Sequence, residues 1–182
     1  MESIKPNNVK IATKWAVIYT ITSIVLTYGT EILNLDPNSP VKYLSYLPFI
    51  AFCFLAQKEF KDQLGGYITF GQGFNTGFKY SLFSGFLLAI FFYVYLAYLN
   101  PGALDKAAEQ QQAVLAEKNM SQEQIDKAMQ MTKDYGAIFG AVVAAVGSLI
   151  SGCIISLITA AILKKERSPF DAVDTTVDEP AV

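Results

Sequence analysis

Residues 136–163 have the sequence GAIFGAVVAAVGSLISGCIISLITAAIL, a run of 28 positions without a single charged side chain. The hydrocarbon core of a bilayer is about 30 Å thick, so a helix needs about 20 apolar residues to cross it. This run is long enough, and Lys164 and Lys165 follow it directly. It therefore predicts a transmembrane helix and decides the class of fold.

The remaining sequence separates apolar from charged residues in the same way. Hydrophobic residues make up 52% of the 182 positions and charged residues 16%, against about 25% charged in a typical soluble domain. Three further apolar stretches cover residues 15–33, 41–57 and 74–99. The sequence thus predicts an all-α fold, an integral membrane four-helix bundle within residues 1–167. For the short second stretch, which contains Pro48 near its middle, a buried or re-entrant segment is the alternative.

A polar segment, residues 101–135, separates the last two spans and predicts an extracytoplasmic helical hairpin. Its first half places Leu104, Ala108, Gln111 and Leu115 at helical spacing. Ser121 followed by Gln124 is the pattern of a capping box, so a second helix should start near residue 122. Nothing in the sequence stops that helix before the fourth span.

Basic residues predict the orientation, because lysine and arginine near span ends favour the cytoplasmic side. The two tails and the loop 57–79 hold nine of them, whereas the opposite side holds three close to a span end. Both termini should therefore be cytoplasmic. The acidic segment 168–182 has no basic residue and should be a disordered tail.

Several functional classes lose support from the composition. The chain has no histidine, the commonest metal ligand and general base, and its net charge is −2. Cys53 and Cys153 both lie in apolar stretches, where unpaired, buried thiols are expected. We find no nucleotide-binding loop, no metal-ligand cluster and no basic stripe for nucleic acid. We therefore expect that the protein is not an enzyme and that it binds no cofactor and no metal.

Small residues recur at every fourth position in the third and fourth spans. Membrane helices associate through close backbone approach, which small residues permit. The two spans should run antiparallel, so residues at equal depth have numbers that sum to about 234. The predicted packing pairs are Gly77 with Ser156, Ser81 with Gly152, Gly85 with Ser148, and Ala89 with Ala144.

Polar residues on one face of the first span are the candidate functional residues: Thr20, Ser23, Thr27, Glu31 and Asn34. The ordinary interpretation is that the hydroxyls bond to their own helix and that Glu31 touches water at the interface. The functional one is that the face lines a path through the membrane, because ionisable intramembrane groups are costly and often functional. Lys79 leaves the same choice open, between an anchor that reaches the interface and a ligand contact.

Three segments also carry a resemblance: Gly65-Gly66-Tyr67-Ile68-Thr69-Phe70-Gly71-Gln72-Gly73-Phe74, then Asn100-Pro101, then the run from Met120 to Met129. In this order they resemble the family known as domain of unknown function 4199, over about residues 10–165. The resemblance implies a small bacterial membrane protein with about four spans, in the inner (cytoplasmic) membrane. It implies no activity and no site residues.

Two functions compete on this basis. The first is a non-enzymatic structural or accessory component of the membrane that binds a protein partner through the hairpin 101–135. The alternative is a small transporter or channel, as a monomer or a homo-oligomer, that uses the polar face of the first span. A membrane enzyme has the least support.

Overall fold

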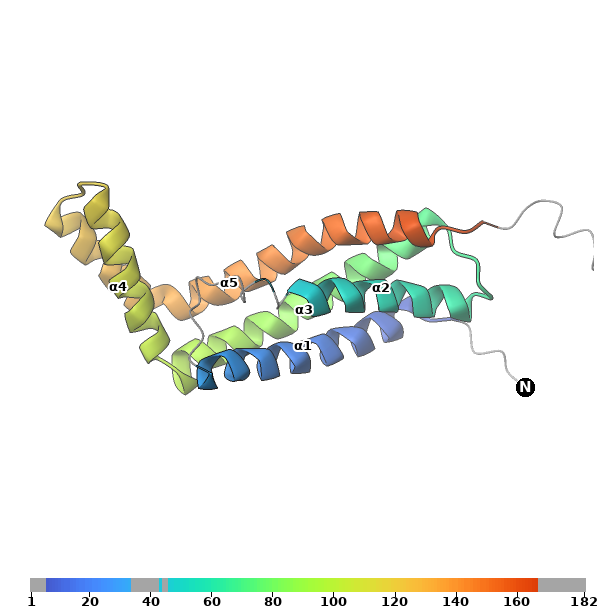
Figure 1. Ribbon diagram of the computed structural model, residues 1–182, viewed down its shortest axis with the longest axis horizontal. Coiled ribbons are helices and arrows are strands. Elements are labelled where there is room, and N and C mark those ends of the chain that lie inside the picture. The colour runs from blue at the N-terminus through green and yellow to red at the C-terminus, as the bar shows by residue number, and fades with distance from the viewer. Residues whose placement is uncertain (1–5, 34–42, 44–45, 167–182) are drawn as a thin grey trace, which may run out of the picture.

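The computed structural model describes residues 6–33, 43 and 46–166, and the predicted acidic tail and Asn34 lie outside this part of the chain. The all-α prediction is confirmed, since the described elements are helices joined by short loops. In chain order they are α1 (Asn8–Ile32), α2 (Tyr46–Gln63), α3 (Phe70–Val94), a π-helix (Tyr95–Leu99), α4 (Gly102–Glu117) and α5 (Gln122–Leu163). Helices α1, α2, α3 and most of α5 lie side by side, and α4 projects from one end with the start of α5 (Figure 1). We call this the hairpin end and the opposite one the loop end.

Three helices within the described residues are long and apolar enough to cross a membrane: Asn8–Ile32, Phe70–Leu99 and Gln122–Leu163. The predicted second span, 41–57, is not among them. The helix in that region is α2, which runs from Tyr46 to Gln63 and ends in polar residues. Pro48 consequently lies in the first turn of α2 rather than near mid-helix. In that turn a missing N–H costs no helical hydrogen bond, so Pro48 is compatible with the start of a regular helix.

Contacts between the helices fix their directions. At the loop end, the Lys79 ammonium lies 3.0 Å from the Asn8 side chain, and at the hairpin end the Tyr28 and Tyr95 rings lie 5.9 Å apart. Helices α1 and α3 are therefore parallel. The Tyr80 hydroxyl donates to the Phe49 carbonyl at 3.2 Å, so the first turn of α2 meets the middle of α3. Of the described helices, only α1, α3 and α5 extend through the hairpin half of the bundle.

Side-chain caps set the starts of the long helices. Ser121 and Gln124 form the predicted capping box at α5, which then continues unbroken for 42 residues. A second capping box, Thr69 with Gln72, starts α3. Before it, the turn uses Gly65 and Gly66 at φ of 80° and 87°, a region that favours glycine.

Candidate functional site

The small residues of α3 and α5 lie along the line where these two helices touch. A β-carbon at Gly77 would overlap the side chain of Ser156, and one at Gly152 would overlap Ser81. At Gly85 it would lie 3.3 Å from the Ser148 Cβ. The structure thus places the members of three of the four predicted pairs against each other. We call this contact line the α3–α5 seam.

The two small residues that begin the α5 stripe, Gly136 and Gly140, meet different neighbours. A β-carbon at Gly140 would lie 2.8 Å from Leu96 Cδ1 in the π-helix. One at Gly136 would lie 2.7 Å from Leu104 Cδ2 in α4. Because a four-residue step advances about 40° around a helix, the stripe winds from α3 towards α4. Gly136 and Gly140 therefore pack at the base of the hairpin.

Gln57 connects α2 to the α3–α5 seam. It was not identified as a contact residue from the sequence. Its side chain is fully buried, and its Nε2 donates to the Ser156 carbonyl at 3.4 Å. The thiol of Cys53, also buried, lies 3.6 Å from the Ser156 hydroxyl. Within the described residues Gln57 Oε1 has no hydrogen-bond partner. Polar side chains of this kind connect helices across an apolar interior.

The polar face of α1 is divided between two kinds of contact. Thr20 and Thr27 donate to the carbonyls of Ala16 and Ser23 in their own helix, at 2.8 and 2.9 Å. These bonds match the ordinary interpretation of membrane hydroxyls. Ser23 is half-buried on the same helix. Among the described residues of this face, Glu31 is hydrogen-bonded to another helix.

The Glu31 carboxylate connects the end of α1 to the π-helix. Its Oε1 accepts from the Asn100 amide at 2.6 Å, and its Oε2 accepts from the Tyr95 hydroxyl at 3.0 Å. The same amide lies 2.9 Å from the Tyr95 hydroxyl, which closes a triangle. We call these three residues the Glu31 junction. Nothing in the sequence linked Tyr95 or Asn100-Pro101 to Glu31.

A π-helix is uncommon and occurs mostly as a single turn, often at functional positions. Here it follows α3 directly, and the Asn100 N–H donates to the Tyr95 carbonyl at 2.7 Å. The wider turn places Asn100 and the Tyr95 side chain on the same side as Glu31. The junction therefore fixes the point at which the chain leaves the bundle for α4.

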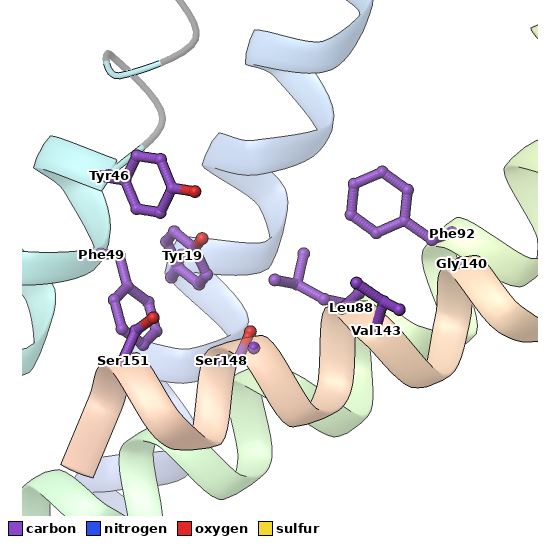
Figure 2. A pocket seen from close by; sticks show the side chains of 11 residues that line it. Tyr19, Tyr46, Phe49, Leu88, Phe92, Gly140, Val143, Ser148 and Ser151 are labelled. Carbon is purple, nitrogen blue, oxygen red and sulfur yellow. The ribbon is translucent and has the colours of Figure 1, made fainter. Parts of the chain in front are cut away.

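A cavity of about 460 Å³ lies in the hairpin half of the bundle, beside the first turn of α2. Figure 2 shows Tyr19, Tyr46 and Phe49 on one side of it and Leu88 and Phe92 on the other. The lining is mainly apolar, and α1 contributes only Tyr19. None of Thr20, Ser23, Thr27 and Glu31 lines it.

The hairpin consists of α4 packed against the first part of α5. Ala108 and Ile125 are buried in their contact. Across it, the Thr132 hydroxyl donates to Gln111 Oε1 at 2.6 Å, and Lys133 pairs with Asp105 at 3.0 Å. The face predicted to be apolar is thus the face that joins the two helices. Outside it Val114 and Met131 are exposed.

Within the described residues no group of three or more histidine, cysteine or acidic side chains could hold a metal ion. Cys53 is buried and Cys153 half-buried, and both are free thiols. The Glu31 junction and the hairpin next to it are the two parts of the structure from which a function can be argued.

These features define a class, the helical membrane proteins, here with three helices that could span a bilayer. The chain belongs to the family described as protein of unknown function (DUF4199), whose profile matches residues 14–165. No curated protein and no solved structure matches it significantly.

Proposed function

We propose that this chain is a non-enzymatic accessory component of the bacterial inner membrane that presents its hairpin, residues 101–135, to a protein partner outside the cytoplasm. The observation that carries the proposal is the continuity of α5 over 42 residues. At about 1.5 Å per residue that helix is about 63 Å long, roughly twice the hydrocarbon thickness of about 30 Å. One rigid element therefore joins the membrane-embedded bundle to the hairpin.

Contacts at the base support a hairpin held in one position. Leu104 of α4 packs on Gly136, and Leu96 packs on Gly140. The Glu31 junction adds a hydrogen-bonded link from α1 to Asn100, directly before α4. A surface that is already ordered loses less conformational entropy on binding. This arrangement suits recognition of a folded partner.

The alternative, a small transporter or channel, has less support. It relied on the polar face of α1 as the lining of a path. Thr20 and Thr27 bond to their own helix, and Glu31 lies at the hairpin end in contact with Tyr95 and Asn100. The cavity beside α2 has a mainly aromatic and aliphatic lining.

Site-specific photo-crosslinking in native membranes tests the proposal. We expect a crosslinker at exposed hairpin positions, Gln112 and Val114, to capture one and the same protein. A crosslinker at Phe86, an exposed apolar position of α3, should give lipid adducts instead. Gly136→Leu should weaken the hairpin adduct, because the new side chain displaces Leu104. Equal protein capture from Phe86 and Gln112, or none from the hairpin, would contradict it.

The orientation has its own test. A cysteine at Gln112 should react with an impermeant thiol reagent on intact cells, whereas one at Asp174 should react only after the cells are broken. The expectation comes from the excess of lysine and arginine at the loop end and in the tails. The opposite labelling pattern would move the hairpin to the cytoplasm.

A further inference from the structure

Lys79 carries a positive charge that no carboxylate neutralises within the described residues. The ion pairs found there join Lys14 to Glu59, Lys133 to Asp105 and Lys164 to Glu166. The half-buried Lys79 ammonium instead donates to a neutral group, the Asn8 side-chain oxygen, at 3.0 Å. A charged group inside a membrane-crossing helix is costly, so it usually has an oppositely charged partner.

Lys79, Asn8 and Asn75 form a cluster that presents hydrogen-bond donors at the surface. The Asn8 amide nitrogen donates to the Asn75 side-chain oxygen at 3.0 Å. Both asparagine oxygens are thereby engaged as acceptors. An ammonium has three N–H donors and an asparagine amide two. Within the described residues, N–H groups of Lys79, Asn8 and Asn75 therefore remain to bind an acceptor.

A phosphate group fits this surface. It is an anion whose oxygens accept hydrogen bonds, and a charged acceptor bonds more strongly to such donors than a neutral one does. A carboxylate on the protein would compete for the lysine, and the described part of the chain places none there. The same arrangement suits phosphate from a lipid headgroup or from solution.

The surface next to the cluster favours the lipid. Starting at Asn75, residues three and four positions apart share one face of α3, and Phe78, Leu82 and Phe86 continue that face as exposed apolar side chains. Lys79 lies nine residues, about 14 Å, inside the first residue of α3, and its side chain extends back towards Asn8. Asn8 is the first residue of α1, so the Lys79 ammonium lies at the level where that helix begins, the direction in which membrane lysines extend towards the headgroups. The donors thus lie where a headgroup would be and the apolar stripe where its chains would be.

We propose that Lys79, Asn8 and Asn75 bind the phosphate of a bilayer phospholipid at the loop end, with an acyl chain along Phe78, Leu82 and Phe86. This site is separate from the hairpin and does not depend on its partner.

Lipid titration of the purified full-length chain in detergent, followed by native mass spectrometry, tests the site. The probes are phosphatidylglycerol, diacylglycerol with the same chains, and inorganic phosphate. We expect phosphatidylglycerol to bind and Lys79→Gln to weaken its binding about fivefold, the effect of one lysine near an anionic lipid surface. The control Lys58→Gln removes an exposed lysine of α2 near the same end and should change binding little. Lys79→Arg should retain most of the affinity.

A further variant distinguishes a loss of lipid binding from a loss of folding. Asn75 is exposed, so Asn75→Leu should leave the fold intact while removing two donors, and it should also weaken binding. Equal losses for Lys79→Gln and Lys58→Gln would overturn the site in favour of diffuse charge attraction. Diacylglycerol binding as tight as phosphatidylglycerol would exclude phosphate recognition. Competition by inorganic phosphate at equal concentration would show a site for soluble phosphate instead.

Discussion

Helix α5 makes two helix pairs that differ in how they are held. Against α3 it forms the α3–α5 seam, where Gly77, Gly85 and Gly152 bring the backbones together. Against α4 it forms the hairpin, where larger side chains such as Leu104 and Ile125 fill the contact and polar groups pair across it. The same continuous helix therefore uses two packing chemistries, one at each end.

We attribute the difference to the two surroundings of the proposed arrangement, lipid around the α3–α5 seam and water around the hairpin. Lipid tails are as apolar as leucine, so burial of a large side chain gives membrane helices little drive to associate, and close contact between backbones must replace it. In water, burial of apolar surface is favourable in itself, while exposed ion pairs contribute little. The seam should therefore tolerate added volume poorly, and the hairpin should tolerate loss of its ion pair well.

The largest effect should come from filling the seam. Gly152→Leu adds a side chain where even a β-carbon overlaps Ser81, and overpacking typically costs about 1–3 kcal/mol. The matched control is Gly147→Leu on the same helix, where a β-carbon would meet nothing within 4 Å. Both changes gain about 1 kcal/mol of helix propensity. Unfolding in mixed detergent micelles should show a loss for Gly152→Leu and none for Gly147→Leu, and equal behaviour would mean that the two helices do not pack along this line.

An intermediate effect is expected at the Glu31 junction, where the two regions meet. Asn100→Ala removes the donor to the Glu31 carboxylate and should cost on the order of 1 kcal/mol, a typical value for one hydrogen bond. Glu31→Gln should change little further once Asn100 is gone, because the residues act as one unit.

A double-mutant cycle measures that coupling, with hydrogen exchange of α4 amides as the readout of hairpin order. Gln112→Ala on the exposed side of the hairpin is the control and should couple to neither residue. Fully additive effects of Asn100→Ala and Glu31→Gln would show that the junction does not form in the membrane.

The α3–α5 seam could be predicted from the sequence because a repeat of small residues determines its geometry. Two helices with small residues at every fourth position must match in depth when they are antiparallel, and the pairs of Gly77, Ser81 and Gly85 follow by arithmetic. The capping box of Ser121 and Gln124 could also be predicted, because its two residues are close together in the sequence. Thr69 and Gln72 show the same pattern at α3, and the sequence would have allowed that cap to be found as well.

The Glu31 junction could not be predicted in this way. Its partners Tyr95 and Asn100 are 64 and 69 positions away along the chain, and the π-helix that orients them leaves no periodic pattern. Glu31 was grouped with Thr20 and Thr27 because all three share a helix face, although the hydroxyls bond locally. Gln57 was taken as the end of a span because hydropathy ended the second helix there, whereas α2 continues to Gln63. Long-range polar contacts of this kind depend on the tertiary register.

The smallest effect should come from the hairpin ion pair. Lys133 and Asp105 are joined at 3.0 Å, but their side chains remain 53% and 60% exposed, and such pairs contribute about 0–1 kcal/mol. Lys133→Met keeps the aliphatic part of the side chain and should change hydrogen exchange of α4 by less than about fivefold, an effect that 0.5 M salt reproduces in the unmodified chain. Thr132→Val, which removes the donor to Gln111 in the same contact, is the comparison and should cost more. A loss for Lys133→Met as large as that for Gly152→Leu would reverse the contrast, because the hairpin would then be held by charge rather than by its buried contact at Ala108 and Ile125.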